Sequence, residues 1–213
     1  MGRICFKMTD PGLKCRGYQF KADVVNTCDA ATCVREGFHA AENPLDCFSY
    51  YSSFDNSEFW LCLADGEIHE DLSDTKLSCT ELVFVRRLEL FEMVAFACQY
   101  ILRHPKRKLS ERVKRDMGQT DSNGYVIVIG KDPLGGCASG GKAIGLVRTD
   151  ESGTPVEFSV LTKDAIEEGK IYNMAGDQHH CHHQSGRRRQ QHHQYRNRFH
   201  GSHADTFCQA RKF

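Results

Sequence analysis

Two short motifs in the chain have the residue types of known metal and phosphate sites. Cys28 and Cys33 are separated by four residues, the ligand spacing of one half of a structural zinc site. No second pair follows, so this spacing does not predict a metal centre. Residues 136–142 fit the phosphate-loop pattern G-x-x-x-x-G-K, but Ala143 stands where a serine or threonine would hold magnesium. We therefore expect no resident metal or cofactor at either motif.

Two longer motifs near the N-terminus concentrate charged and aromatic side chains. Residues 15–20 read C-R-G-Y-Q-F, and residues 37–51 read G-F-H-A-A-E-N-P-L-D-C-F-S-Y-Y. Together they resemble an uncharacterised domain of phage and prophage proteins with a C-R-G-x-Q-F box and a G-F-H-x-x-E-N-P-L-D-x-F-x-Y-Y box. The resemblance covers residues 1–104 and continues more loosely over residues 124–177. It implies a phage setting and no particular activity.

The order of these residues is also similar to that of ADP-ribosyltransferase-like cores. Such cores carry an arginine on an early strand, a G-F-[H/S] strand before a helix, and a glutamate on a later strand. This likeness implies NAD as the cofactor, with Arg16 at its phosphates and His39 at its ribose. Tyr50 or Tyr51 would contact the nicotinamide ring. Glu81 would be the carboxylate that stabilises an oxocarbenium-like transition state.

The chain also departs from that pattern. The usual Ser-Thr-Ser box is Phe-His-Ala at residues 38–40, and the usual acidic pair is Cys-Thr-Glu at residues 79–81, with one acid. The same side chains also suit structural roles. Arg16 can pair with Glu36 or Glu42, and the tyrosines can belong to the core. The transferase interpretation is therefore an alternative, and whether the chain is an enzyme stays open.

A protein that acts by binding another protein is the first hypothesis, because no catalytic, metal or nucleotide motif is complete. In a phage setting this would be an accessory protein in the host bacterial cytoplasm. Its partner would be an unidentified host protein, such as a defence or regulatory factor. Aromatic side chains are enriched at binding hot spots. We expect a partner patch formed by Tyr50, Tyr51, Phe54 and Trp60.

Basic residues indicate a third hypothesis, weak contact with nucleic acid. Clusters of lysine and arginine attract phosphates without regard to sequence. A solvated basic surface is the simpler explanation of the same pattern. The residues concerned are Lys106, Arg107, Lys108, Arg187, Arg188 and Arg189.

The composition is that of a folded body with appendages. The 213 residues are 40% hydrophobic and carry no formal net charge. The first residues lack an apolar leader, and the longest apolar stretch is too short to span a bilayer. We predict an α+β fold in which a small mixed domain is closed by one amphipathic helix. A small antiparallel β unit and a disordered tail follow. The predicted boundaries are 1–104, a basic connector 105–119, the β unit 120–177 and a His/Arg-rich tail 178–213.

Local patterns place the main elements of this fold. Asn43 can cap a helix that begins at Pro44. Apolar residues at spacings of three and four predict an amphipathic helix over residues 91–102, which Pro105 ends. Apolar and β-branched runs predict buried strands at residues 59–63, 82–85, 125–129, 143–148 and 155–161.

Overall fold

The computed structural model describes residues 2–32, 35–51, 53–70 and 74–179. Of these residues, 49% lie in strands and 12% in helices, so the predicted α+β class is wrong and the fold is mostly β. The reason is that strands run on beyond their apolar segments. The predicted strand over residues 59–63, for example, belongs to a strand that ends only at Glu70, with exposed side chains along its outer half.

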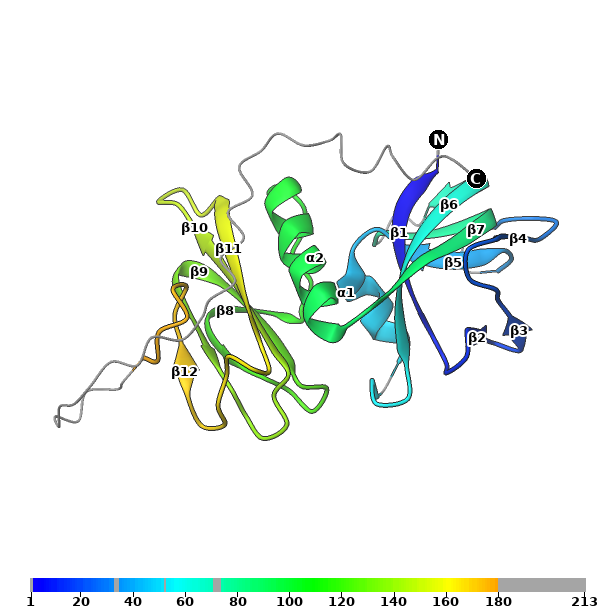
Figure 1. Ribbon diagram of the computed structural model, residues 1–213. Helices are drawn as coiled ribbons and strands as arrows, with labels where there is room; N and C mark the ends of the chain where they lie inside the picture. The colour runs from blue at the N-terminus through cyan, green and yellow to red at the C-terminus, as the bar shows by residue number, and fades with distance from the viewer. Residues whose placement is uncertain (1, 33–34, 52, 71–73, 180–213) are drawn as a thin grey trace, which may run out of the picture.

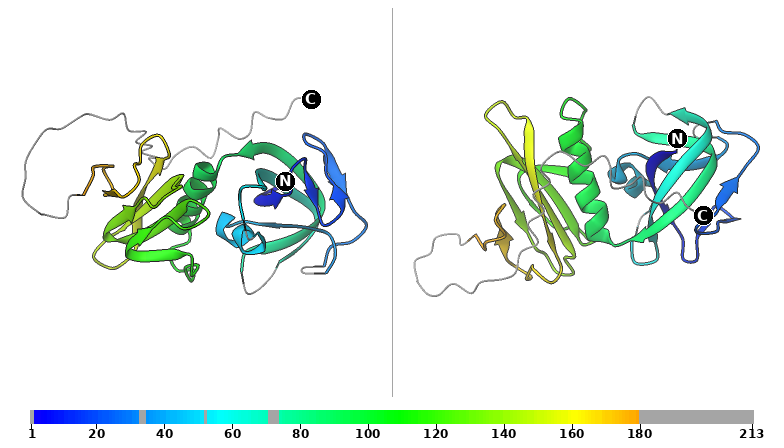
Figure 2. Two further views of the ribbon diagram at one scale, coloured as in Figure 1. Left: turned by 90° about the horizontal axis from the view of Figure 1, so that it is seen from below. Right: turned by 45° about the horizontal axis from the view of Figure 1, so that its top comes forward.

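The first sheet closes into a small antiparallel barrel (Figures 1 and 2). Pairing runs from β6 to β1, from β1 to β5, from β5 to β7, and from β7 back to β6, which closes the ring. A short strand, β4, extends the sheet beside β7, and β2 and β3 form a separate hairpin. The strands are β1 (Arg3–Thr9), β2 (Lys14–Cys15), β3 (Tyr18–Gln19), β4 (Val25–Thr27), β5 (Phe38–Ala41), β6 (Glu58–Glu70) and β7 (Lys76–Leu88).

β1 is buried on both of its faces. Cys5 faces the barrel interior, where Cys62 and Cys79 are likewise fully buried. Phe6 and Met8 belong to the neighbouring core cluster on the opposite face. Because side chains alternate along a strand, Lys7 shares the face of Cys5. A lysine is therefore placed on the inner face of the barrel.

The segment that follows β5 turns the chain through α1 (Pro44–Cys47) and one turn of 3₁₀ helix, η1 (Phe48–Tyr50). The predicted helix start is confirmed: the side chain of Asn43 accepts a hydrogen bond from Leu45 N (3.2 Å), and Pro44 lies in the first turn. Asp46 accepts bonds from the backbone N (3.0 Å) and the hydroxyl of Thr75. Much of the second motif therefore serves to hold this turn against the start of β7.

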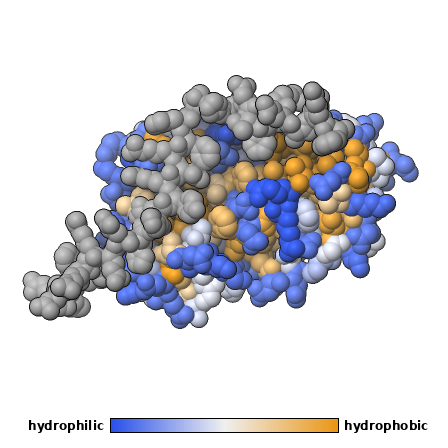
Figure 3. All heavy atoms as spheres, viewed as in Figure 1, coloured by the Kyte–Doolittle hydropathy of each residue, from blue (hydrophilic) through white to orange (hydrophobic). Residues whose placement is uncertain are grey.

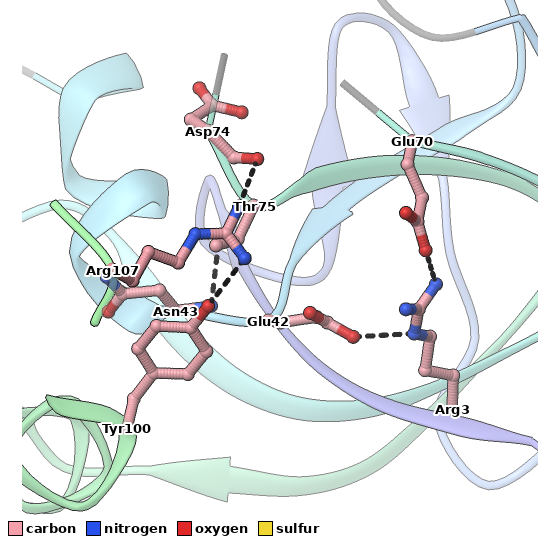
Figure 4. A network of polar contacts seen from close by, with 8 residues as sticks. All are labelled: Arg3, Glu42, Asn43, Glu70, Asp74, Thr75, Tyr100 and Arg107. Carbon is pink, nitrogen blue, oxygen red and sulfur yellow. Dashed lines mark hydrogen bonds and ion pairs between the residues drawn. The ribbon is translucent and has the colours of Figure 1, made fainter. Parts of the chain in front are cut away.

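A polar network around α1 ties four parts of the chain together (Figure 4). Arg3 on β1 pairs with Glu42 through Nε (2.5 Å) and also bonds Glu70. The backbone N of Asn43 donates to the hydroxyl of Thr75 (2.9 Å). Glu42 thus has a basic partner on β1, and it is not the partner of Arg16.

The predicted amphipathic helix is confirmed as α2 (Leu90–Arg103). Glu89 and Glu92 form a capping box at its N-terminus, and it ends before Pro105. α2 lies between the barrel and a second sheet (Figures 1 and 2) and packs on strands β9, β10 and β11. One core cluster includes residues of β1, α2 and β9. α2 is therefore covered on two sides. Its buried residues are Leu90, Met93, Val94, Ala97, Cys98 and Ile101, whereas Phe91, which the apolar spacing places on the buried stripe, is 38% exposed.

Gly145 on β10 lies under α2. A Cβ atom added there would lie 2.8 Å from both Cys98 Sγ and Val94 Cγ1 of the helix. Gly145→Ala is therefore expected to lower the free energy of unfolding by about 1–3 kcal/mol, the usual range for overpacking a core. Urea denaturation would measure the change. Gly136→Ala is the matched control, because its added Cβ meets Gln119 at an ordinary 3.4 Å. Equal effects of the two substitutions would show that the helix can move aside.

The second sheet is mixed, so the prediction of an antiparallel β unit is also wrong. β8 and β10 both pair with β9 in parallel, whereas β11 pairs with β10 and β12 with β9 in antiparallel fashion. The direction of pairing depends on distant segments of the chain, and the composition of a single strand does not specify it. The strands are β8 (Val113–Gln119), β9 (Tyr125–Gly136), β10 (Ala143–Thr149), β11 (Pro155–Thr162) and β12 (Ile171–Tyr172).

The surface of the molecule carries both hydrophobic and hydrophilic residues. On the face shown in Figure 3, patches of hydrophobic residues lie between hydrophilic ones. No helix among the described residues is long and apolar enough to cross a membrane. The predicted disordered tail, including Arg187, Arg188 and Arg189, falls almost wholly on residues 180–213, outside the described residues.

Candidate functional site

A cavity of about 830 Å³ lies at the barrel, bordered by β1, the β2–β3 hairpin, β5 and η1. Four of the five residues singled out in the sequence line it: Arg16, His39, Tyr50 and Tyr51. Glu81 does not. It lies on β7, paired with Thr27 of β4 and with Asp65 of β6. The structure thus brings the basic and aromatic side chains of the predicted site together in one cavity, but it does not place the predicted catalytic carboxylate there.

Lys7 supplies a buried positive charge to this cavity. Its side chain is 7% exposed, and its Nζ donates a hydrogen bond to the backbone oxygen of His39 (2.6 Å). The same Nζ lies 5.5 Å from the centre of the Phe20 ring. No carboxylate pairs with Lys7 in the described part of the chain. Buried charges in proteins are normally paired, so this one is an exception.

Arg16 lies at the tip of the β2–β3 hairpin in a conformation that arginine rarely adopts. Its φ is +48°, and that of Gly17 is +82°, so both central residues of the turn are left-handed. Such two-residue turns favour Asn, Asp or Gly at these positions. Arg16 is exposed and has no ion pair within residues 2–32, 35–51, 53–70 and 74–179. A strained backbone at a cavity is a reason to suspect a function.

His39 and Lys76 complete the polar wall. Burial lowers the pKa of His39, and the charges of Lys7, Arg16 and Lys76 lower it further. Lys76 pairs with Asp74 (3.0 Å), and its Nζ lies 5.2 Å from the centre of the Tyr50 ring. Burial opposes its charge, but hydrogen bonds to Tyr50 and Asp74 outweigh that effect and raise its pKa.

The two tyrosines of the second motif have different roles. Tyr51 donates a hydrogen bond to the backbone oxygen of Met8 (2.7 Å), and burial together with the neighbouring Cys15 raises its pKa. It therefore fastens η1 to β1. Tyr50 is 52% exposed and is the one of the two that a ligand can reach more readily.

The predicted partner patch of four aromatic residues does not form one exposed surface. Phe54 is buried and stacks on Tyr125 at 5.9 Å. Trp60 is half-buried and contacts Phe84 edge-on at 5.6 Å. These rings were predicted to be exposed because of their type, but the barrel and the second sheet cover most of them.

Sequence reasoning missed several residues that line the cavity, namely Lys7, Asp10, Tyr18, Asp46 and Lys76. Of these, Lys7 had a signal that could have been used. It interrupts the apolar run Ile4-Cys5-Phe6-Lys7-Met8, and a lysine inside a buried strand is unusual. The two aspartates offset part of the positive charge, although Asp46 already accepts two bonds from Thr75.

The basic connector has more structure than its composition indicates. Arg107 donates to the hydroxyl of Tyr100 (3.0 Å) and to the backbone oxygen of Asp74 (2.9 Å), as Figure 4 shows. Lys106 and Lys108 on either side of it are exposed. Among the described residues, no three His, Cys, Asp or Glu side chains are placed to hold a metal ion.

Part of the chain matches a known protein family. Residues 3–95, which include the barrel and the first turn of α2, match a family described as a Domain of unknown function (DUF7666). No curated protein and no solved structure matches the chain. The match supports the resemblance to an uncharacterised domain and is silent on activity.

Proposed function

We propose that the barrel domain binds a small anionic ligand in its cavity. The observation that supports this is Lys7, a buried residue that lines the cavity and has no carboxylate partner among the described residues. Burying an unpaired charge is costly, and a bound anion would act as its counter-ion. The exposed guanidinium of Arg16 at the cavity mouth would add charge-assisted hydrogen bonds to the same anion.

Inorganic pyrophosphate is a suitable first probe, because it presents a high negative charge without any other chemistry. Calorimetric titration of the full chain should show binding that weakens as salt is raised, since part of the attraction is between exposed charges. Absence of binding at low salt, with the protein shown to be folded, would contradict the proposal.

The pH dependence of stability and of binding gives a separate prediction. Burial lowers the pKa of His39, so the unfolded chain binds a proton at a higher pH than the folded chain. The free energy of unfolding should therefore fall as the pH drops below about 6.5, the ordinary histidine value. A bound anion favours the protonated ring, so affinity for sulfate, whose charge stays constant, should rise over the same range.

His39→Gln separates this residue from other titrating groups. The variant should lose both the decrease in stability and the increase in sulfate affinity, measured by urea denaturation and calorimetry between pH 5 and pH 8. The charged groups that act on His39 are Lys7, Arg16 and Lys76. If the variant kept the parent's pH dependence of stability and of sulfate affinity, a group other than His39 would be responsible for it.

An NAD-dependent transferase is a second candidate, supported by the presence of Arg16, His39, Tyr50 and Tyr51 in one cavity. The observation against it is that Glu81, its catalytic carboxylate, does not line the cavity. Labelled NAD added to a lysate with the full chain tests this directly. If label were transferred by the parent chain and not by the Glu81→Ala variant, the result would support Glu81 as the catalytic carboxylate. If pyrophosphate bound but no label were transferred, only the proposal of an anion-binding site would be supported.

Two hypotheses from the sequence remain proposals. An accessory role toward a host protein rests on the resemblance of the motifs to phage and prophage proteins. Contact with nucleic acid through Lys106 and Lys108 rests on their charge and exposure. A steep dependence of DNA affinity on salt that is lost in a Lys106→Gln, Lys108→Gln double variant would support the second of these.

A further inference from the structure

The cavity has an aromatic wall in addition to its cationic one. The centre of the Tyr18 ring lies 4.6 Å from the centre of the Phe20 ring and 5.0 Å from the centre of the Phe38 ring. The centres of the Phe20 and Phe38 rings are 5.0 Å apart. Phe20 and Phe38 are buried, whereas Tyr18 is 41% exposed, and all three line the cavity. Two buried rings thus hold a third in place with part of its surface accessible.

The size of the cavity argues against a bare anion as its only occupant. At about 830 Å³ it lies within the range of small-molecule sites, about 300–1,000 Å³, and far exceeds the volume of one phosphate group. An ion held by Lys7 and Arg16 would leave the aromatic wall facing water. Ser53, Asn56 and Ser57 also line the cavity and provide hydroxyl and amide groups. A ligand that fills this space would have an anionic, a polar and a flat apolar part.

The hairpin places two of these contacts close together. Arg16 and Gly17 form its turn, and Tyr18 is the first residue of β3, opposite Cys15. The side chain of Gln19 secures the hairpin by donating to the backbone oxygens of Gly12 (2.7 Å) and Phe20 (3.0 Å). One short, braced element therefore presents both a guanidinium and an aromatic ring to the cavity.

We infer that the ligand is a nucleotide, whose phosphate contacts Lys7 and Arg16 and whose base stacks on Tyr18. This inference rests on the proposed function and adds the class of ligand to it. Bases stack on aromatic side chains whatever their identity, because each base has a π-face. The serine and asparagine side chains at the cavity suit the hydroxyl groups of a ribose. Tyr18 is then the residue that selects a base-bearing phosphate over a plain one.

Three probes separate the parts of the ligand: AMP, ribose 5-phosphate, which lacks the base, and adenosine, which lacks the phosphate. With the full chain, calorimetry should show AMP binding about tenfold more tightly than ribose 5-phosphate, a difference typical of one stacked base. Tyr18→Leu should weaken AMP binding to the level of ribose 5-phosphate and leave the latter unchanged. Tyr18→Trp should restore the difference.

Phe91→Leu is the matched control, because Phe91 is 38% exposed on α2 and does not line the cavity. It should change none of the affinities. Equal binding of AMP and ribose 5-phosphate would overturn the nucleotide inference and leave the proposed anion site intact. If neither pyrophosphate, AMP nor ribose 5-phosphate bound, the result would overturn both the proposed anion site and the nucleotide inference. Adenosine binding as tightly as AMP would contradict the proposed anion site.

Discussion

Replacing Lys7 by methionine is expected to abolish the binding of pyrophosphate and to leave the stability of the protein nearly unchanged. Methionine fills a similar volume and needs no counter-ion. Replacing buried charges by apolar side chains is often neutral or stabilising by about 1–4 kcal/mol. Loss of the charge-assisted bond from Nζ to the His39 oxygen offsets about 1.5–3 kcal/mol of that gain. We therefore expect the free energy of unfolding in urea to change by less than about 1 kcal/mol.

Lys131→Met is the control for this substitution. The Lys131 side chain is 65% exposed and pairs with Glu151 at 2.7 Å. Surface pairs of this kind contribute little, so neither stability nor binding should change measurably. If Lys7→Met destabilised the protein and pyrophosphate still bound, Lys7 would be a structural residue and the proposed site would fail.

Arg16→Asn is expected to weaken pyrophosphate binding tenfold or more without destabilising the fold. A hydrogen bond to a charged group contributes about 1.5–3 kcal/mol, and about 1.4 kcal/mol corresponds to a factor of ten in the dissociation constant. Asparagine adopts positive φ more readily than arginine, so the strain at +48° should decrease. Thermal unfolding of the free protein should therefore occur at the same temperature or slightly higher.

Asp23→Asn provides the comparison for Arg16→Asn. Asp23 also has a positive φ, +59°, and it does not line the cavity. This variant should bind pyrophosphate as the parent does. Unaltered binding by Arg16→Asn would show that the hairpin tip does not reach the anion, and it would leave the strain at Arg16 without a function.

Local sequence patterns predicted individual elements well and their assembly poorly. The cap at Asn43, the helix ended by Pro105 and the strand over residues 125–129 depend on neighbours in sequence, and they were correct. The barrel depends on pairings between distant segments, such as Cys5 with Cys62. No periodicity within one strand specifies its partner, so the closed ring and the parallel strands could not be derived.

The candidate site was predictable where its residues stand in motifs. Arg16, His39 and Tyr50 lie in the two motifs whose order is similar to that of ADP-ribosyltransferase-like cores. Lys7 was missed because its importance comes from burial and from the lack of an ion pair among the described residues, which are three-dimensional properties. Glu81 was chosen by its order along the chain, and order does not determine which face of a strand points to a cavity.

The thiols inside the barrel have a consequence for how its motions can be observed. Cys5, Cys62 and Cys79 are fully buried, and burial raises the pKa of Cys79 to about 12. A thiol reagent attacks only an accessible thiolate, so these positions react only when the barrel opens. Cys15, at the cavity, is partly exposed. The reaction rate of the buried cysteines therefore measures how often the barrel opens. The reaction rate of Cys15 measures whether the cavity is occupied.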